Sequence, residues 1–335
     1  MFRSRRKGLV LAIAVVLMPI GTTEARELSF EQRVQVQEAI EKLRHRHRTG
    51  TTGPFEEAVP RAVLESQVRR YLEQSAALER DWNTPVTADA LRRESERIAR
   101  RTRMPARLRE LYTALDHDGF LFQECIARPV LVNRLTRSFF ATDERIHGTG
   151  GRSPDPSTRI SWDDWWRVNH KRFHHDSVDP VADAFAPVPE TGSGRNENDG
   201  ESCPAPDTWD NGVLEGIPGR QVGHVTAWTG TEMVTWGGLG GGGTGLRYDP
   251  ALDVWWPVTW TDAPAGRGDA AAVWTGSELI VWCGSVGMGA VHSNDGARYD
   301  PVSDTWSPIS SVDAPAPRRR ATAVWTGTEM IVWGG

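Results

Sequence analysis

Cysteine, tyrosine and lysine are all scarce in this 335-residue chain. The three cysteines, Cys125, Cys203 and Cys283, lie far apart and form no C-x-x-C pair, which argues against a zinc site. An odd number of cysteines also permits at most one internal disulfide. Lysine occurs only three times, so arginine carries almost all of the positive charge, and a net charge of −5 gives no reason to expect nucleic acid as a partner.

Long hydrophobic runs are also absent, apart from one near the N-terminus. Residues 9–20 are apolar, follow a positive stretch from Arg3 to Lys7, and precede the small residues around Ala25. This order is typical of a secretory signal peptide, and the run is shorter than the roughly 20 residues that span a bilayer. We therefore expect a signal peptide over residues 1–25 and a secreted or periplasmic protein without a membrane span after cleavage, with an uncleaved anchor as the alternative.

Residues 26–147 show apolar side chains at helical spacing and predict a helical domain. Ser29 with Gln32 forms a candidate capping box, and prolines and further capping residues begin the other segments. The residues expected to begin helices are Ser29, Pro60, Thr87, Pro105, Asp118 and Pro129. Arginine alternates with glutamate on the outer faces, which indicates a solvated, ion-paired surface.

Residues 148–206 predict a loop, a short aromatic helix from Trp162 to Phe173, and a flexible linker rich in breakers. His170 and His174 stand four residues apart in that helix, a spacing that can present two imidazoles to a metal. The glutamate that zinc hydrolases place between such histidines is missing, so no metal site is predicted.

The remaining residues, 207–335, repeat themselves. A tryptophan followed by Thr-Gly-Thr/Ser-Glu occurs at Trp228, Trp274 and Trp325, roughly 50 residues apart, and each copy leads into an apolar run and a pair of small residues. Two copies continue into Arg-Tyr-Asp-Pro and a further tryptophan. The expected structural positions of the repeat are Gly237, Gly238, Tyr248, Trp255, Gly284, Tyr299, Trp306, Gly334 and Gly335.

Each recurring residue type has a physical purpose. The glycine of the Thr-Gly loop permits positive φ in a tight hairpin, the paired glycines allow close backbone approach, and Asp-Pro turns the chain between strands. The apolar runs predict strands buried on both faces. We expect four tryptophans to pack as wedges between neighbouring sheets: Trp228, Trp255, Trp274 and Trp306.

This ordered set resembles the kelch motif, in which an apolar strand and a glycine doublet are followed by Tyr and Trp seven positions apart. The resemblance implies a β-propeller built of four-stranded blades. The fold class is then multidomain, α plus all-β: a helical domain followed by about two and a half blades. Because propellers close with four or more blades, we expect the sequence to be part of a longer protein.

Together with the expected signal peptide, the kelch resemblance implies an exported, non-catalytic interaction protein whose propeller is a scaffold for a protein or glycan ligand. Four residues are candidates for binding on one propeller face: Arg220, His224, Arg267 and Arg318. The alternative for the arginines is pairing with turn aspartates. No catalytic residue, cofactor or metal ligand is predicted.

Two other functions stay open. Some kelch propellers resemble copper oxidases of the galactose oxidase type, or mutarotases, whose active site would then lie in blades beyond this sequence. The helical domain resembles the chaperone arms of periplasmic parvulin-type prolyl isomerases, on the helix start at Val86 to Leu91. That resemblance implies a chaperone-like role without isomerase activity.

Overall fold

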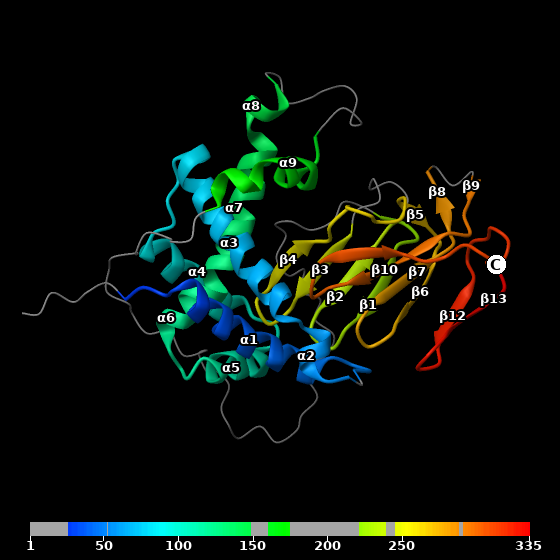
Figure 1. The fold of residues 1–335 in the computed structure, drawn as a ribbon, viewed down its shortest axis with the longest axis horizontal. Coiled ribbons are helices and arrows are strands. Elements are labelled where there is room, and N and C mark those ends of the chain that lie inside the picture. Colours follow the sequence, from blue (N-terminus) through cyan, green and yellow to red (C-terminus); the bar gives the residue numbers. More distant parts are fainter. Residues whose placement is uncertain (1–25, 52, 149–159, 175–220, 239–244, 288–290) are drawn as a thin grey trace, which may run out of the picture.

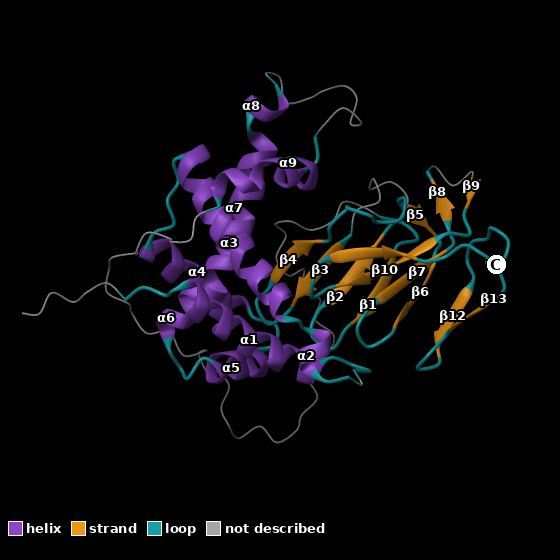
Figure 2. Cartoon of the chain, in the orientation of Figure 1, coloured by secondary structure: helices purple, strands orange, loops and turns teal. Residues whose placement is uncertain are grey.

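The computed structural model describes residues 26–51, 53–148, 160–174, 221–238, 245–287 and 291–335. The chain is a mixed α+β protein in which helices form one part and antiparallel sheets the other (Figure 1). The described strands form no closed ring of sheets. Figure 2 shows the helices grouped on one side and the strands on the other, with β12 and β13 farthest from the helices.

The helices begin where capping residues were expected. Ser29 and Gln32 form both hydrogen bonds of a capping box, and Thr87 and Asp118 accept hydrogen bonds from the first turns of their helices. The helices are α1 Phe30–His47, α2 Phe55–Ala58, α3 Arg61–Trp82, α4 Ala88–Arg101, α5 Pro105–Ala114, α6 Gly119–Phe122, α7 Arg128–Thr142, α8 Glu144–His147 and α9 Trp162–Asn169, with a 3-10 turn η3 at His170–Phe173.

The expectation that Pro129 begins a separate helix was wrong. A π-helical turn, η1 at Gln123–Ala127, joins α6 to α7 without a break, and Pro129 lies in the first turn of α7. Proline has no N–H and crowds the carbonyl four residues earlier, here that of Cys125. The wider π turn accommodates this proline inside a continuous helical segment.

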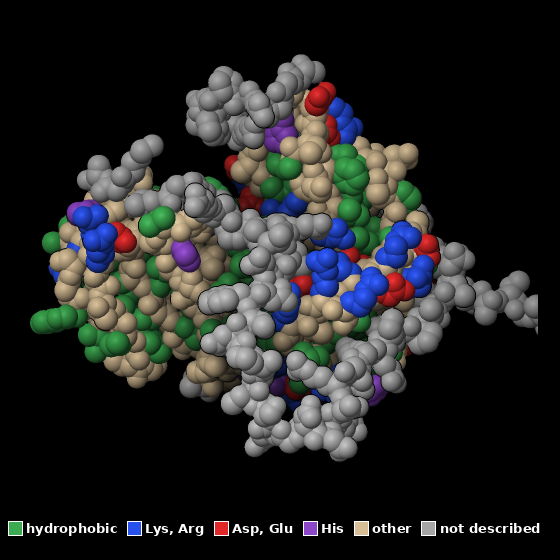
Figure 3. Space-filling model, turned by 180° about the vertical axis from the view of Figure 1, so that it is seen from behind, with side chains coloured by type: hydrophobic (Ala, Val, Ile, Leu, Met, Phe, Trp, Pro, Cys, Tyr) green, Lys and Arg blue, Asp and Glu red, His purple; other side chains and the backbone are tan. Residues whose placement is uncertain are grey.

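The outer faces of the helices are ion-paired, as expected. Arg92 bonds to Asp89 and Glu96, and Arg93 bonds to Asp89, all on one face of α4. Figure 3 shows basic side chains beside acidic ones over the helical part of that view. Water and salt screen such exposed pairs, so they keep the surface solvated more than they stabilise the fold.

Two four-stranded antiparallel sheets follow each other along the chain. The first has the order β1-β2-β3-β4 and the second β6-β7-β10-β11, while β12 pairs with β13 and β5-β8-β9 form a small additional sheet. The strands are β1 Val225–Trp228, β2 Met233–Trp236, β3 Leu246–Asp249, β4 Val254–Pro257, β5 Arg267–Gly268, β6 Ala271–Trp274, β7 Leu279–Trp282, β8 Ser285–Val286, β9 Val291–His292, β10 Gly296–Asp300, β11 Thr305–Pro308, β12 Thr322–Trp325 and β13 Met330–Trp333.

The spacing between Tyr and Trp in the repeat reflects strand pairing. Tyr248 lies opposite Trp255 across β3 and β4, and Tyr299 lies opposite Trp306 across β10 and β11. Their ring centroids are 4.8 and 5.0 Å apart. The Asp-Pro turn between them brings the rings together, so the motif encodes an aromatic cross-strand pair.

The tryptophans do not all pack as wedges. Trp306 is buried and contacts Trp236 with ring centroids 4.6 Å apart, but Trp228 is 44% exposed. Alternation along β1 explains the difference, because Val225 and Ala227 face the core shared with the second sheet and Trp228 points to the opposite side. The expectation for Trp228 was therefore wrong.

The helices and the first sheet share one hydrophobic core. Ala251, Leu252 and Val254, at the β3–β4 turn, pack with side chains such as Ile40 and Leu108 of the helical part. Val302, at the equivalent turn of the second sheet, packs against α3 residues including Val68. The helical part is therefore fixed on the edge where these turns lie.

The hairpin glycines make this contact possible. Gly230 and Gly276 have φ of 104° and 108°, and a Cβ atom would lie 2.1 Å from the His47 carbonyl oxygen at the first and 2.2 Å from the Gly50 carbonyl oxygen at the second. Gly327, at the same position of the third copy, has a φ of 110° and open space around it. The helical part thus contacts the hairpins of two sheets and leaves the third uncovered.

No helix within the described residues is both long and apolar enough to cross a membrane. The expected signal peptide, residues 1–25, lies outside the described part of the chain, as do residues 187–206 of the expected linker. Cys125 and Cys283 are buried and free. Cys283 has a φ of 59°, a value that suits the glycine found at this position in the other copies.

Candidate functional site

A cavity of about 610 Å³ lies at the junction of the helices and the two sheets. Its walls come from α1, α3, α7 and α9 on one side and from the strand turns of both sheets on the other. Pockets of this size hold small ligands, and polar groups that converge in them fix the ligand's orientation. This cavity is therefore the candidate functional site.

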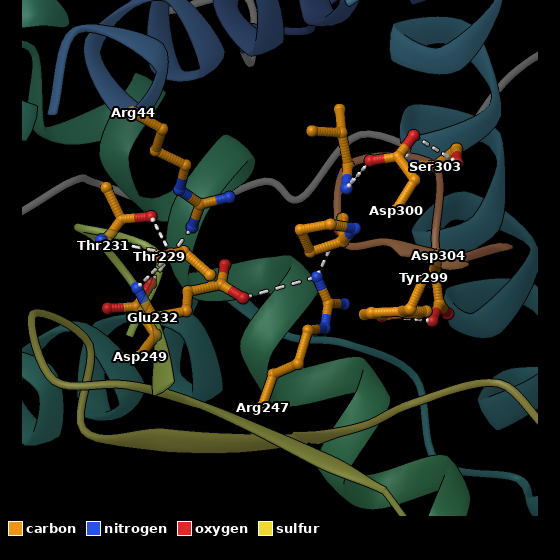
Figure 4. A network of polar contacts seen from close by, with 12 residues as sticks. Arg44, Thr229, Thr231, Glu232, Arg247, Asp249, Tyr299, Asp300, Ser303 and Asp304 are labelled. Carbon is orange, nitrogen blue, oxygen red and sulfur yellow. Dashed lines mark hydrogen bonds and ion pairs between the residues drawn. The ribbon is translucent and has the colours of Figure 1, made fainter. Parts of the chain in front are cut away.

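A polar network connects α1 to the first sheet at one wall (Figure 4). Arg44 of α1 contacts Glu41 at 3.0 Å and Asp249, at the end of β3, at 3.1 Å. The positive charge of Arg44 lowers the pKa of Asp249, but burial outweighs it and leaves that pKa raised. The pair ties the helical part to the sheet through groups that are mostly withdrawn from water.

Arg247 connects the two sheets. Its Nη1 lies 2.6 Å from the carbonyl oxygen of Pro301 and 3.4 Å from a carboxylate oxygen of Glu232, as Figure 4 shows. Pro301 belongs to the second sheet's turn, whereas Arg247 and Glu232 belong to the first sheet. One guanidinium therefore bridges consecutive repeats beside the cavity.

The side of α3 that faces the cavity carries Gln67 and Arg70. Gln67 donates to the carbonyl of Val302 at 2.8 Å, and Arg70 contacts Asp304 at 2.9 Å. Asp304 also accepts from the Tyr299 hydroxyl at 2.8 Å. Burial would raise the pKa of Asp304, but Arg70 and Arg247 lower it, so the carboxylate is charged near neutral pH.

Glu73 and the two histidines form a clamp between α3 and η3. The Nδ1 atoms of His170 and His174 lie 3.2 and 2.9 Å from the carboxylate oxygens of Glu73, and Arg69 contacts Nε2 of His174 at 2.9 Å. Because Arg69 can only donate, Nε2 of His174 accepts and its Nδ1 donates. Both nitrogens of His174 are thus engaged in hydrogen bonds.

Within the described part of the chain, the structure gives no cluster suited to a metal. Among the described residues, no group of three or more His, Cys, Asp or Glu side chains is placed to hold a metal ion. Cys125 lines the cavity, but burial raises the pKa of its thiol to about 12, which keeps it protonated and unreactive.

The four residues expected on a binding face have different environments. Arg220 lies outside the described residues, and His224 is exposed. Arg267 has a fully buried side chain that bonds to the carbonyl of Cys283 at 3.2 Å and to Asp295 at 2.6 Å. Arg318 makes the equivalent bond to the carbonyl of Gly334 at 2.9 Å. These two arginines hold strand ends together, and Arg267 has no surface left for a ligand.

Several cavity residues gave no signal in the sequence. Arg137 of α7 and Gln74 of α3 both line the cavity, yet each stands in an ordinary amphipathic helix. Only the contact between helices and sheets, made by residues far apart in sequence, gives them a shared environment. No family model and no curated protein matches the chain.

Proposed function

We propose that the chain is an exported, non-catalytic binding protein in which a kelch-type β-propeller and the helical part together enclose a ligand site. The observation that carries the proposal is the cavity of about 610 Å³ at their junction. Both parts contribute charged side chains to it, among them Arg70 and Arg247. A site assembled from two parts requires both to be docked, which the shared core provides.

The arrangement of the sheets supports the proposal that this part of the chain is built as a propeller. The first strands of successive sheets, β1, β6 and β12, lie next to each other, and each sheet continues outward through antiparallel neighbours. Sheets arranged radially about their first strands are the building unit of a propeller. The repeated Tyr–Trp pairs and hairpin glycines give consecutive units the same local geometry.

The chemistry of the cavity favours binding over catalysis. Glu73 is held by two histidines, Asp304 by Arg70 and Tyr299, and the Cys125 thiol is protonated. A general base or nucleophile needs a free lone pair near the reacting atom. Glu73 and Asp304 are engaged in structural ion pairs and hydrogen bonds, and the thiol of Cys125 retains its proton.

The shape of the cavity favours a glycan over a protein ligand. Protein partners bind to extended surfaces of about 800 Å² on each side, whereas sugars and other small ligands are enclosed by concave sites. Trp166 lines the cavity, but its ring stacks on Trp162 and Phe173. Trp256 also lines the cavity and is partly exposed, so it offers an apolar ring surface beside polar groups. This combination suits the alternating apolar and hydroxyl surfaces of a sugar ring.

Titration calorimetry of the whole chain against a panel of mono- and oligosaccharides tests the proposal. We expect saturable binding, and we expect Ser66→Trp to weaken it because exposed Ser66 lines the cavity. Thr113→Trp is the control, since Thr113 is exposed on α5 away from the cavity. Binding that is equal in both variants, or no binding by the wild type, contradicts the proposed site.

A further inference from the structure

Arg137 lines the cavity, and its guanidinium has no close carboxylate partner among the described residues. Its Nε atom is buried and has no hydrogen-bond partner, and its nearest carboxylate oxygen among the described residues, on Asp163, is 3.9 Å away. The guanidinium carbon lies 5.1 Å from the ring centroid of Trp162, which fixes its plane. The side chain keeps 29% exposure, and it lines the cavity.

The neighbouring arginines already have close partners. Arg70 lies 2.9 Å from Asp304, and Arg44 lies 3.1 Å from Asp249. Arg247 is 2.6 Å from the Pro301 carbonyl. Charge-assisted hydrogen bonds have lengths of about 2.7–2.9 Å, so Arg137 at 3.9 Å from Asp163 lacks one.

Asp163 is also bonded to the loop that follows β4. Its carboxylate accepts a hydrogen bond from the backbone N–H of Trp260 at 3.2 Å. Burial lowers the pKa of Arg137 and raises the pKa of Asp163, the directions expected for two opposite charges that lie too far apart to replace their lost hydration. An added anionic oxygen beside Arg137 would supply the missing partner.

Two neutral amides of the cavity wall also lack partners. Gln74 is only 2% exposed, and its side chain makes no hydrogen bond within the described part of the chain. Asn133 lies one helical turn before Arg137 on α7, and the described residues likewise offer its side chain no partner. Gln74 is a buried amide, and buried amides normally have hydrogen-bond partners, whereas Asn133 is partly exposed. Both amides are available for hydroxyl groups.

We propose that this cavity binds a sugar acid, with its carboxylate at Arg137 and its hydroxyl groups at Gln74 and Asn133. The inference rests on the proposed function and specifies its ligand. The partly exposed indole of Trp256 contacts the apolar side of the sugar ring. The carboxylate of the ligand supplies the negative charge that Asp163, at 3.9 Å, is too distant to provide fully to the Arg137 guanidinium.

Titration calorimetry of the full chain at pH 7 tests the inference with four probes: D-glucuronate, D-glucose, glutarate and inorganic phosphate. Glucuronate and glucose differ only at C6, where the first carries a carboxylate. We expect glucuronate to bind at least ~10-fold more tightly than each other probe, because a hydrogen bond to a charged group is worth about 1.5–3 kcal/mol. If glucose binds as tightly as glucuronate, the site does not select for a sugar acid, and this inference fails while the proposed function still stands.

Substitutions locate the carboxylate. Arg137→Gln lowers glucuronate affinity ~10-fold or more and leaves glucose affinity unchanged. Arg92→Gln is the control, because Arg92 forms exposed ion pairs on α4 outside the cavity wall. Asn133→Asp is the second variant, and it keeps the test possible if Arg137→Gln does not fold. Its new carboxylate, one helical turn from Arg137, should repel the carboxylate of glucuronate and weaken binding.

Each remaining outcome counts against the inference. Glutarate or phosphate binding as tightly as glucuronate means a general anion site, which overturns the sugar acid. Unchanged glucuronate affinity in folded Arg137→Gln or Asn133→Asp places the carboxylate elsewhere. The absence of binding by any sugar overturns the proposed function together with the inference.

Discussion

Asp253 and Asp304 hold the same position in successive repeats, but among the described residues only Asp304 contacts the helical part through its side chain. Asp253 contacts it through its backbone carbonyl, which accepts a hydrogen bond from Arg97 of α4 at 3.2 Å. Each accepts a hydrogen bond from the tyrosine five residues before it, at 2.7 Å for Tyr248 and 2.8 Å for Tyr299. Asp304 additionally contacts Arg70 at 2.9 Å, whereas the Oδ2 atom of Asp253 is buried without a partner. The side chain at this motif position thus has a local role in the first sheet and a bridging role in the second.

Replacing these aspartates should give unequal losses of stability. Asp304→Asn removes the charge facing Arg70, and we expect a loss of about 2 kcal/mol in the free energy of unfolding. Asp253→Asn keeps an oxygen for Tyr248 and removes a poorly compensated charge, so the loss should stay below about 1 kcal/mol. Urea denaturation of the two variants checks the difference; equal losses would mean that the contact with Arg70 adds nothing.

The hairpin glycines allow the contact with the helical part to be tested separately from backbone strain. Gly230→Ala, Gly276→Ala and Gly327→Ala all place a side chain at a φ between 104° and 110°, so the strain is shared. Only the first two introduce a clash with the helical part. We expect them to lower stability by at least about 2 kcal/mol more than Gly327→Ala does, in line with the cost of overpacking. Thermal unfolding followed by circular dichroism measures this, and three similar melting temperatures would contradict the docking.

Arg267 and Arg318 offer another matched pair. The Arg267 side chain is fully buried and bonds to Asp295, so Arg267→Gln leaves buried acceptors unpaired and should cost about 3 kcal/mol or more. Arg318 makes the equivalent backbone bond in an exposed position, and Arg318→Gln should cost less than about 1 kcal/mol. Chemical denaturation compares the two; a small effect at Arg267 would reopen it as a binding residue.

A buried triad in the helical part predicts a pH dependence. Glu124 lies 2.7 Å from Arg33 and 2.8 Å from Arg128, and all three side chains are at most 5% exposed. Burial opposes ionisation, but the two arginines prevail and hold the pKa of Glu124 below its usual 4.5. The folded state therefore binds this proton less readily than the unfolded state, and the stability that Glu124 contributes is lost as pH falls below about 4.5 through the folded pKa.

Glu124→Gln should be less stable at pH 7 by about 3–5 kcal/mol, because two buried guanidinium groups lose their counter-charge. The free energy of unfolding of the variant should also fall less between pH 7 and pH 3 than that of the wild type, because the variant has no carboxylate to protonate at this position. Glu38→Gln is the control, since Glu38 is an exposed partner of Lys42. Denaturant midpoints between pH 7 and pH 3 measure both effects, and parallel pH curves for wild type and Glu124→Gln would exclude the assignment.

The local features of the fold were predictable because adjacent residues encode them. Ser29 and Thr87 cap helices through bonds to backbone a few residues away, and Tyr299 meets Trp306 across a short turn. Pro129 was misjudged because a π turn accommodates a proline, and short-range rules do not foresee that turn. Trp228 was misjudged because the sequence does not say which face of β1 a neighbouring sheet covers.

The candidate site could not be predicted because it depends on long-range contacts. Arg137 and Asp163 come from different helices, and Asp304 comes from a sheet more than a hundred residues further on. Each looks like an ordinary surface charge in its own segment. Arg267 shows the reverse case, because a residue that the repeat suggested for ligand binding is used to join strand ends.

The segment 49–51 touches both sheets at once. The Thr49 N–H donates to the carbonyl of Thr229 at 2.8 Å, and the Thr51 hydroxyl donates to the carbonyl of Gly276 at 3.1 Å. Because one short, continuous stretch of backbone holds hairpins from two units, it restricts their rotation about each other. Any adjustment to an incoming molecule must therefore move the helices as a rigid body over both sheets, or else break these hydrogen bonds first.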